Sequence, residues 1–591
     1  MNTLQHIIFP EPAICTEHHL YYKIDGAGGF SSSDQSIRMS TGALLKLGTY
    51  FNLFSIAKWG QAGALGSLSF SLDAIGTFEL KIIQALPDKS WDTLFCDVIT
   101  FTEKSRFDAD LSHFSTHGNQ GVIAVEIRSL GDNTVIFGGQ FQTDKQPETW
   151  PKLAISITTF KREQEVETTA ERLSKFLDAH PIGQHIQAYV VDNGKSVEIA
   201  NSEHVSVIEN RNLGGAGGFA RGLIEADNEG FSHVLFMDDD ASFHMENIYR
   251  TYMFLALSTN PKAAVAGAMI NNTHKWRMWE NGAIFNRTCR PQFIGTDLRE
   301  QKAVMRAEFE SASRIHAKGY YGGWWFFAFP VSQVQHYPFP FFVRGDDVNF
   351  SLANDFDIYT INGVVSFQDD FTEKESPLTL YLDLRGHLLH HMLFEHMDIG
   401  AFKTLGIVWH FFRRSLERFH YETAEAQLLS FADVMRGPAF FDENIDMAQR
   451  RQDVKALTKN EYWKPMTEVE VSERRLIPSH NHVTNTVMEW TLNGHLMLFS
   501  SYWMNHYVIP IHHRGMVWPA WGATQLTFVN ANRDMGYTVK QSKKRFFGLF
   551  RRYLGLAIKF LFQYRKLRDA YREAYPRMTS KAYWMEATHD K

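Results

Sequence analysis

Short apolar runs alternate with helix-compatible segments through the middle of the chain, and this order most constrains what the sequence can fold into. The apolar runs end in polar residues, written "TTFKRE", "VDNG", "NRNLGG" and "DDD". Strands separated by helices predict α/β layers over a mainly parallel sheet. Such a sheet binds ligands outside the carboxyl ends of its strands. The four polar strand ends therefore mark the expected ligand-binding edge.

The sequence on either side of this region has a different pattern of apolar residues. Residues 1–150 contain alternating runs such as "SLSFSLDA" and "GVIAVEI", which predict antiparallel strands in a β-sandwich. From about residue 381 the pattern is mostly that of amphipathic helices. A chain of 591 residues is also too long for one hydrophobic core. We therefore expect three domains: a β-sandwich at 1–150, an α/β domain at 151–380 and a mainly helical region at 381–591.

Composition argues against several classes of protein. The net charge of −6 argues against a general nucleic-acid binder. The three cysteines are widely spaced, which favours neither a disulfide framework nor a cysteine zinc site. No run of about 18 apolar residues occurs, and the N-terminus lacks the pattern of a signal peptide. The sequence thus predicts a cytoplasmic protein without a spanning helix.

A glycine-rich segment, "NRNLGGAGGFARG" at residues 210–222, follows one strand-like run and opens a helix-like one. Its glycines allow the backbone to approach a phosphate at the helix N-terminus. An aspartate cluster lies roughly 20 residues later, where a nucleotide-dependent oxidoreductase of the Rossmann type places its ribose-binding acid. That task needs one acid, whereas the chain supplies three.

The three acids of "FMDDDA" are Asp238, Asp239 and Asp240. A hard cation such as Mg²⁺ or Mn²⁺ prefers oxygen ligands, and alternate residues of an extended segment point the same way. Asp238 and Asp240 are therefore expected to face a cation, and Asp239 to point away. Adjacent carboxylates raise one another's pKa unless a cation compensates them. The alternative is a solvated acidic turn without a metal.

The segment "PFFVRGDDVNF" contains a second acidic pair, Asp346 and Asp347. Two close carboxylates can split their pKa values, which leaves one of them as a general base, and the alternative is a turn with a helix N-cap. Just upstream, "YYGGWWFFAFP" places Trp324 and Trp325 beside two glycines. Aromatic faces stack on sugars, although two tryptophans also fit an ordinary core. Together the two segments predict another side of a ligand pocket, downstream of the three acids.

In their order, these segments resemble the nucleotide-sugar-binding half of family 2 glycosyltransferases of GT-A fold, in which an Asp-x-Asp element holds a metal on the diphosphate. Over almost the whole chain they are similar to the galactan-polymerising UDP-galactofuranosyltransferases. The resemblance is carried by "LGTYFNLFSIAKWGQ" at 47–61, "NLGGAGGFARG", "DDDA", "GGWW", "DDVNF" and "RMTSKAYW" at 577–584. It implies an α/β GT-A (Rossmann-like) catalytic domain between the β-sandwich and the helical region.

The resemblance also implies a role for each site residue. The reaction would be a metal-dependent, inverting transfer of galactofuranose from UDP-galactofuranose to a glycan or glycolipid acceptor. Asp347 would be the general base, supported by Asp346, and Asp238 and Asp240 would bind Mn²⁺ or Mg²⁺. The donor set around uridine and diphosphate comprises Phe160, Arg162, Asp192, Asn193, Asn212, Asp238 and Asp239, and the acceptor set comprises Trp324, Trp325 and Glu280.

One position departs from the family. The family has a metal-binding His in a Gly-Val-x-x-Trp-His context, where this chain reads "GVVSFQDD" at 363–370. Gln368 stands in its place, so Gln368, Asp369 or Asp370 is expected to complete the metal shell, or the metal is held more loosely. A histidine cluster with the spacing of a helix face is a second candidate, although the family has a helix flanking the pocket there. It consists of His387, His390, His391 and His396.

Residues 542–568 carry nine Lys or Arg and no acid, interleaved with Phe, Leu and Tyr. This pattern is typical of an interfacial helix on an anionic membrane surface, or of a packed helix whose basic residues face solvent. The resemblance favours peripheral association with the inner face of the cell membrane, because galactan acceptors are lipid-linked there. It also implies a symmetric homo-oligomer.

Three functions are open on the sequence alone. The first is the galactofuranosyltransferase, or a transferase of the same fold that uses another UDP-sugar. The second is the nucleotide-dependent oxidoreductase, and the third is a carbohydrate-binding protein with a degenerate transferase domain, which the replaced His would explain.

Overall fold

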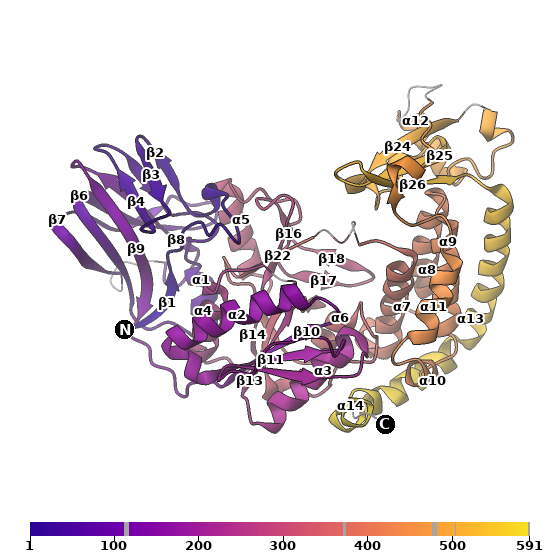
Figure 1. Cartoon of the computed structure of the whole chain (residues 1–591), viewed down its shortest axis with the longest axis horizontal. Helices are drawn as coiled ribbons and strands as arrows, with labels where there is room; N and C mark the ends of the chain where they lie inside the picture. Colours follow the sequence, from indigo (N-terminus) through magenta and orange to yellow (C-terminus); the bar gives the residue numbers. More distant parts are fainter. Residues whose placement is uncertain are drawn as a thin grey trace.

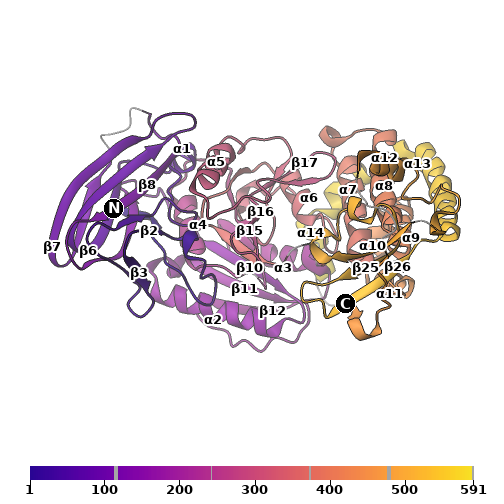
Figure 2. The same ribbon diagram turned by 90° about the horizontal axis from the view of Figure 1, so that it is seen from above.

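The computed structural model describes residues 1–111, 117–240, 242–369, 371, 374–474, 481–502 and 504–588. Three regions follow one another along the long axis of the molecule (Figure 1). An all-β region lies at one end, an α/β region in the middle and a mostly helical region at the other end. The same order is visible from above (Figure 2).

The N-terminal region is built on one nine-stranded sheet in the order β2-β5-β8-β6-β9-β4-β3, with β1 on β9 and β7 on β6. Every pairing is antiparallel, as the alternating pattern predicts. β6 changes partner from β9 to β8 near Gly76, whose φ of +105° and adjacent bulge bend the strand. The two-layered sandwich itself stays a prediction. The strands are β1 (Asn2–His6), β2 (Lys23–Asp25), β3 (Gly28–Ser31), β4 (Ser36–Met39), β5 (Leu44–Lys46), β6 (Leu68–Ala85), β7 (Asp92–Asp110), β8 (Val122–Ser129) and β9 (Thr134–Thr143).

The central region contains a seven-stranded sheet in the order β12-β11-β10-β13-β20-β14-β21. Its first four strands are parallel, and β20 runs antiparallel between β13 and β14. Thr159 pairs with Asp192, and Thr158 pairs with Asp238, so the carboxyl ends of β10, β11 and β13 meet at one edge. The strands are β10 (Leu153–Thr159), β11 (Ile186–Asp192), β12 (Val205–Glu209), β13 (His233–Asp238), β14 (Ala263–Ala266), β20 (Phe326–Pro330) and β21 (Asp357–Tyr359).

Helices cover both faces of this sheet because its strands are apolar on both sides. Ile155 and Leu235 pack in the same core as residues of α2 (Glu163–Ala179) and α4 (Glu246–Leu257). Their strand neighbours Ala154 and Phe236 pack instead with α3 (Gly214–Asn228) and with Trp584 of the C-terminal α14 (Lys581–Thr588). The alternation confirms the α/β layering expected from the sequence.

Two small sheets lie beside the central one (Figure 1). One joins β16, β15 and β22, and the other joins β18, β17 and β19. α5 and α6 complete this part. The elements are β15 (Ala268–Asn271), β16 (Met278–Glu280), β17 (Ala283–Phe285), β18 (Cys289–Pro291), β19 (Tyr320–Tyr321), β22 (Val365–Gln368), α5 (Gln301–Ala312) and α6 (Asp346–Ala353).

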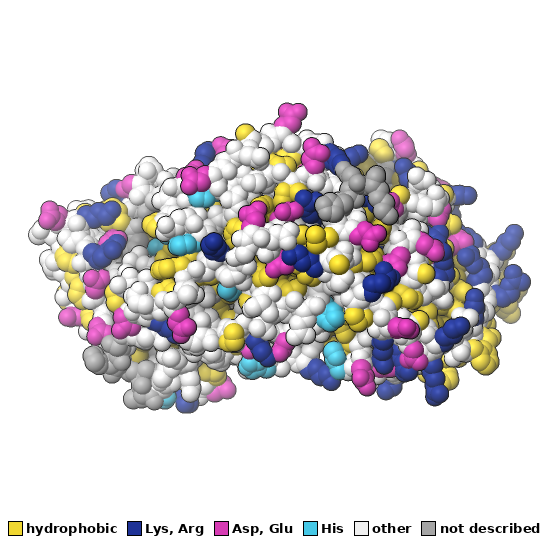
Figure 3. All heavy atoms as spheres, turned by 90° about the horizontal axis from the view of Figure 1, so that it is seen from below, with side chains coloured by type: hydrophobic (Ala, Val, Ile, Leu, Met, Phe, Trp, Pro, Cys, Tyr) yellow, Lys and Arg dark blue, Asp and Glu magenta, His cyan; other side chains and the backbone are white. Residues whose placement is uncertain are grey.

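The C-terminal region is mainly helical, but it also holds a four-stranded sheet, β23-β26-β25-β24, which the helical pattern did not predict. The 36-residue α13 runs along its outer side, and basic side chains gather at that end of the molecule (Figure 3). In the described residues no helix is both long and apolar enough to cross a membrane. The elements are α7 (Pro377–Leu393), α8 (Ala401–Glu417), α9 (Tyr421–Val434), α10 (Ala439–Glu443), α11 (Ala448–Leu457), β23 (Lys464–Pro465), α12 (His482–Trp490), β24 (Asn505–Pro510), β25 (Ala523–Val529), β26 (Met535–Lys540) and α13 (Lys543–Met578).

Candidate active site

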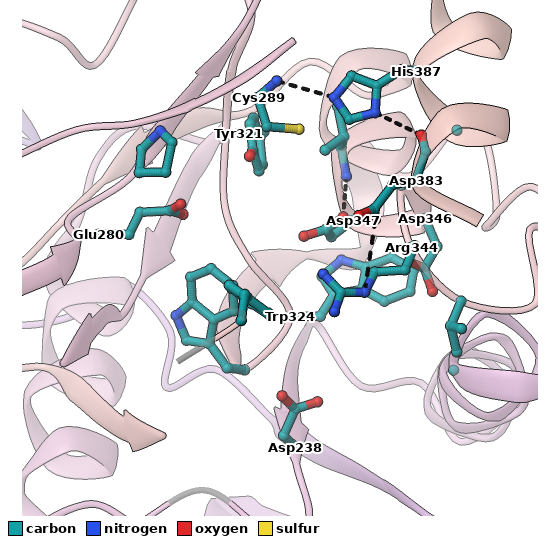
Figure 4. A pocket seen from close by; sticks show the side chains of 18 of the residues that line it. Asp238, Glu280, Cys289, Tyr321, Trp324, Arg344, Asp346, Asp347, Asp383 and His387 are labelled. Atoms are coloured by element: carbon teal, nitrogen blue, oxygen red, sulfur yellow. Dashed lines mark hydrogen bonds and ion pairs between the residues drawn. The ribbon is translucent and has the colours of Figure 1, made fainter. Parts of the chain in front are cut away.

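A cavity of about 380 Å³, which we call the first chamber, opens beyond the carboxyl end of β13. Asp238 lines it from the central sheet, and Asp347 lines it from the first turn of α6. In Figure 4, Asp238 lies on one side, Asp347 lies with Asp383 and His387 on the other, and Trp324 lies between them. The central sheet and the start of the helical region therefore share one pocket.

The three aspartates at the end of β13 have different surroundings. Asp238 faces the first chamber, whereas Asp239 is buried and accepts hydrogen bonds from Thr159 Oγ1 at 2.7 Å and Arg162 Nη1 at 2.9 Å. The carboxylate of Asp240 lies 2.7 Å from Arg162 Nη1 and 3.6 Å from Lys374 Nζ. The middle acid thus supports the loop from within, while Asp238 and Asp240 remain partly accessible.

The surroundings of the Asp238 carboxyl raise its pKa. Burial, and then the charges of Asp240 and Asp239, raise its pKa to about 7, although a hydrogen bond from Gln368 opposes the shift. A pKa raised in this way means that the negative charge is poorly compensated by the protein alone. A bound cation would remove the penalty.

Gln368, the residue in place of the expected His, lies beside Asp238. Its Nε2 donates to Asp238 Oδ2 at 3.0 Å, because the preceding Phe367 bridges to Ser242, just after the three aspartates. Asp369 is exposed, and its Oδ1 lies 3.5 Å from Asn272 Nδ2. Asp370 lies outside the described residues. Of the described alternatives, Gln368 is thus the one whose side chain contacts the Asp-x-Asp element.

These residues fit a hard divalent cation. Asp238 and Asp240 offer carboxylate oxygens, and rotation of the Gln368 amide by half a turn presents its oxygen to the same place. Within the described ranges, a group of three His, Cys, Asp or Glu side chains with metal-ligand spacing occurs instead at Glu17, His18 and His19. The set at Asp238 includes the amide oxygen of Gln368, so it does not count as a group of His, Cys, Asp or Glu alone. Oxygen ligands suit Mg²⁺ or Mn²⁺ better than a softer metal.

The other donor-set residues surround the strand ends but do not line the first chamber. The buried Asp192 accepts from the backbone N–H groups of Gly194, Ser196 and Val197 and so shapes the loop after β11. Asn193 Nδ2 donates to the carbonyl of Gly214 at 3.1 Å, and Asn212 Oδ1 accepts from the Gly214 N–H. Phe160 is 40% exposed. These contacts fix the loop after β11 and the start of α3.

The second acidic pair begins α6. Gly345 precedes it with a φ of +92°, a conformation that favours glycine and lets the chain turn sharply into the helix. Burial, followed by repulsion from Asp347, raises the pKa of Asp346 to about 8. Burial raises the pKa of Asp347 to only about 6, because the Val348 N–H and Arg344 stabilise its charge. Near neutral pH the pair therefore shares a proton, and the Val348 N–H and Arg344 favour the negative charge on Asp347.

The acceptor set lines the same chamber. Glu280, at the end of β16, is 3% exposed, and its Oε1 has no hydrogen-bond partner within the described structure. Burial and then the charge of Asp347 raise its pKa to about 8. Trp324 packs edge-to-face on Phe219 and leaves its indole N–H unpartnered, whereas Trp325 donates to the Gly267 carbonyl at 2.8 Å. Glu280 and Trp324 thus keep polar atoms free for a ligand.

Part of the predicted histidine cluster lines the first chamber, together with Asp383 and Gly386, which no motif indicated. His387 and His390 come from α7, as do Asp383 and Gly386, and Arg344 lies next to the acidic pair. His387 Nδ1 donates to the Asp383 carbonyl at 2.7 Å, and burial lowers the pKa of both histidines. His391 instead bonds the Met397 carbonyl. The helical spacing of the histidines was a signal of a shared face: two of the four line the chamber, and His387 lies on the side of Asp347 (Figure 4).

Comparison with known proteins identifies the domain that carries the aspartates. Residues 154–314 match the family model described as glycosyl transferase family 2. These residues form a family 2 glycosyltransferase domain. The match contains the glycine-rich segment, the three aspartates and Glu280, and it confirms the enzyme class and the GT-A catalytic fold expected from the sequence.

Two curated relatives cover more of the chain. Galactofuranosyltransferase GlfT2 of Mycobacterium tuberculosis is 22% identical over 444 residues, which are 68% of this chain and 67% of that protein. GlfT2 of Mycolicibacterium smegmatis is 20% identical over 437 residues, 68% of this chain and 66% of the relative. The matched part thus spans about two thirds of each relative. This glycosyltransferase is a relative of those galactofuranosyltransferases, as the ordered motifs predict.

Solved structures resemble parts of the chain more remotely. A mannosyltransferase from Pyrobaculum calidifontis, in complex with GDP-Man and Mn²⁺, is 14% identical and covers 53% of this chain and 83% of its own, with a TM-score of 0.28. Mannosyl-3-phosphoglycerate synthase from Rubrobacter xylanophilus is 13% identical and covers 41% and 74%, with a TM-score of 0.26. At these TM-scores no detail of the site is transferred from them.

Proposed function

We propose that this glycosyltransferase moves galactofuranose from UDP-galactofuranose to a hydroxyl of a glycan acceptor, with inversion and with a divalent cation. The observation that carries the proposal is the first chamber, in which Asp238 of the family 2 domain and the Asp346–Asp347 pair line one cavity. The two relatives named galactofuranosyltransferase support the choice of sugar. The oxidoreductase alternative is set aside because the family match is to transferases.

On the donor side, Asp238, Asp240 and Gln368 would hold the cation, which when bound neutralises charge that develops on the departing diphosphate. The predicted donor residues Phe160, Arg162, Asp192, Asn193 and Asn212 would surround the uridine and the diphosphate. Arg162 is already paired with Asp239 and Asp240. A cation that takes over the charge of Asp240 would therefore free one side of the guanidinium for a phosphate oxygen.

On the acceptor side, Asp347 would take the proton of the acceptor hydroxyl as its oxygen attacks the anomeric carbon. The bond from that carbon to the diphosphate breaks on the opposite face, so one displacement inverts the configuration. Asp346, whose pKa burial and the charge of Asp347 raise, would retain the shared proton and donate a hydrogen bond without adding a second charge. Trp324, Trp325 and Glu280 would position the acceptor.

The acceptor is proposed to be lipid-linked, since α13 offers a surface suited to a membrane. Phe562 is 88% exposed, Ile558 58% and Phe547 51%, and basic residues flank all three on the same helix. Exposed apolar side chains beside Lys and Arg fit an anionic interface. Neutralising Lys543, Lys544, Arg545, Arg551 and Arg552 is expected to lower co-sedimentation with anionic liposomes, and unchanged binding would contradict the membrane proposal. The homo-oligomer stays a prediction.

The deciding experiment is a screen for UDP release from several UDP-sugars, with Mn²⁺, with Mg²⁺ and after chelation. We expect release with UDP-galactofuranose and an acceptor, dependence on the cation, and a product of inverted anomeric configuration by NMR. Release from a different UDP-sugar would correct the donor but keep the reaction. No release from any donor would leave a carbohydrate-binding protein with a degenerate transferase domain.

A further inference from the structure

Three metal-ligating side chains follow one another in the N-terminal region, at Glu17, His18 and His19. Each offers one ligand atom, and these atoms all lie within 4.8 Å of one another. The His19 Nδ1 lies 3.5 Å from the Glu17 Oε1, and the centroids of the two imidazole rings are 4.1 Å apart. Among the described residues no other group of three His, Cys, Asp or Glu side chains meets this spacing. The three residues do not line the first chamber.

The backbone that carries these side chains is held by the core of the N-terminal region. The Tyr21 N–H donates to the His18 carbonyl at 2.9 Å and closes the short turn η1 (His18–Leu20). Leu20 and Tyr21 are fully buried, and the Tyr21 carbonyl accepts from Asn52 Nδ2 at 2.7 Å. The three ligating side chains remain at least partly exposed. They therefore extend from a fixed backbone, which lowers the entropy cost of closing around a metal.

The nitrogens of both imidazole rings are available to a metal. In the residues that the structure describes, neither ring makes a hydrogen bond, and His19 only approaches Glu17. Partial burial, and then the proximity of His19, lower the pKa of His18. His18 is therefore neutral at neutral pH, and the neutral imidazole is the form that binds a metal. The Glu17 carboxylate adds a negative charge that favours a cation.

The ligand types select the metal. Two imidazole nitrogens and one carboxylate oxygen suit Zn²⁺, which takes four ligands in a tetrahedron with bonds of about 2.0–2.2 Å. Such bonds space neighbouring ligand atoms about 3.3–3.5 Å apart. Small rotations of the partly exposed side chains reach this spacing from atoms that already lie within 4.8 Å. The set at Asp238 offers oxygens only, which suit Mg²⁺ or Mn²⁺, so the two places differ in the metal that each prefers.

We propose that Glu17, His18 and His19 form a second metal site, which binds Zn²⁺ through two imidazoles and a carboxylate. The fourth position of the tetrahedron is left to water. The nearby Tyr21 hydroxyl lies 2.8 Å from Nε2 of His244, which follows the three aspartates in the α/β region. The metal thus fastens the turn through which the N-terminal region contacts the α/β region. It takes no part in the transfer reaction, so the inference stands apart from the proposed function.

The test is a calorimetric titration of the chelator-stripped full chain with Zn²⁺, in excess Mg²⁺ that occupies the oxygen ligands at Asp238. We expect the wild type to bind one Zn²⁺ per chain more than His18→Ala/His19→Ala. Glu17→Gln removes the charge but keeps the shape, and it should weaken this binding by about tenfold or more. X-ray absorption at the zinc edge is expected to show imidazole ligands in the wild type that are lost in the double variant. Unchanged Zn²⁺ affinity in Glu17→Gln would overturn the three-ligand site.

The matched control is His512→Ala/His513→Ala. These adjacent histidines also have closely spaced rings, with centroids 4.3 Å apart, but among the described residues no third ligand of this kind completes a group with them. The control should keep the additional Zn²⁺. Equal loss in both double variants, or no loss in His18→Ala/His19→Ala, would overturn the proposal.

Amide hydrogen exchange tests the effect on the turn itself. The N–H groups of Tyr21 and Tyr22 both donate to the His18 carbonyl, so Zn²⁺ is expected to slow their exchange in the wild type and not in His18→Ala/His19→Ala. Unchanged exchange at both amides would overturn the fastening role. No donor sugar enters these experiments, so a failure to transfer any sugar would contradict the proposed function alone and leave the zinc site standing.

Discussion

The two acidic edges of the first chamber differ in how far cationic side chains compensate their charges. At the end of β13, the proposed donor edge, Arg162 pairs with Asp239 and Asp240 and compensates part of their negative charge. At the start of α6 and the end of β16, the proposed acceptor edge, Asp346 and Glu280 are buried, and their pKa values rise to about 8. Arg162 thus carries part of the charge at the first edge and leaves Asp238, with a pKa of about 7, uncompensated, whereas the second edge retains protons. The difference teaches that equal numbers of carboxylates can serve metal binding or acid–base chemistry, according to what surrounds them.

The sharpest test of the acceptor edge is Asp347→Asn. We expect kcat to fall about 10²- to 10⁴-fold, the loss that follows removal of a general base. UDP binding should change little, because the donor edge is intact. Asp355→Asn, an exposed aspartate paired with Lys262, is the matched control. Near-normal turnover by Asp347→Asn would remove this residue as the base and break the contrast between the edges.

The donor edge is tested by changing neighbouring aspartates. Asp238→Asn is expected to weaken metal-dependent UDP binding by about 10- to 100-fold, the loss typical when part of a metal site is removed. Asp239→Asn should act mainly on stability, by about 1–3 kcal/mol, because Thr159 and Arg162 lose a charged partner. Calorimetry of UDP with Mn²⁺, and thermal unfolding, measure the two effects. Equal effects of both changes on UDP binding would show that the three acids act as one cluster.

The pH profile of kcat/KM should report the acceptor pair. The base must be ionised, so the rate is expected to fall about tenfold per pH unit below about 6, the pKa of Asp347. It should also fall above about 8, where Asp346 loses its proton and adds a second charge beside the base. Asp346→Asn should remove the alkaline limb and keep the acidic one. A profile that is flat from pH 5 to 9 would contradict this assignment.

The smallest effect concerns stability. The folded pKa of Glu280 is about 8, whereas an unfolded glutamate ionises near 4.3. As pH rises between these values, the unfolded chain releases a proton that the folded protein retains, so stability falls. Glu280→Gln should therefore raise the unfolding midpoint by about 2–4 °C at pH 9 and not at pH 4. A gain that is the same at both pH values would show that the buried charge is not its cause.

The donor edge was predictable because a rule of topology applies to it. Parallel strands bring their carboxyl ends together, so the polar residues after β10, β11 and β13 had to meet whatever their exact contacts. The contrast between Asp238 and Asp239 follows in the same way from the alternation of an extended chain. What the pattern did not contain is the pairing of Arg162 with these acids, since side-chain ion pairs depend on local geometry.

The acceptor edge was only partly predictable. The Asp346–Asp347 pair and Trp324 were visible as motifs, whereas Asp383 looks like an ordinary residue of an amphipathic helix. It lines the first chamber because α7 packs against the end of the α/β region, and such packing leaves no local signal. For the same reason the short strands β24 and β25 were not separated from the helices around them.

The last helix has a mechanical consequence. The chain passes from the α/β region to the helical region at α7, and it returns at the end of α13. There α14 anchors in the α/β region: Trp584 is fully buried and donates to the Pro338 carbonyl at 2.7 Å, and Lys581 pairs with Asp227. Because the chain crosses twice between the two regions and α14 is anchored, the helical region cannot rotate about a single hinge. The two regions whose residues wall the first chamber are therefore held together at both ends of the helical region.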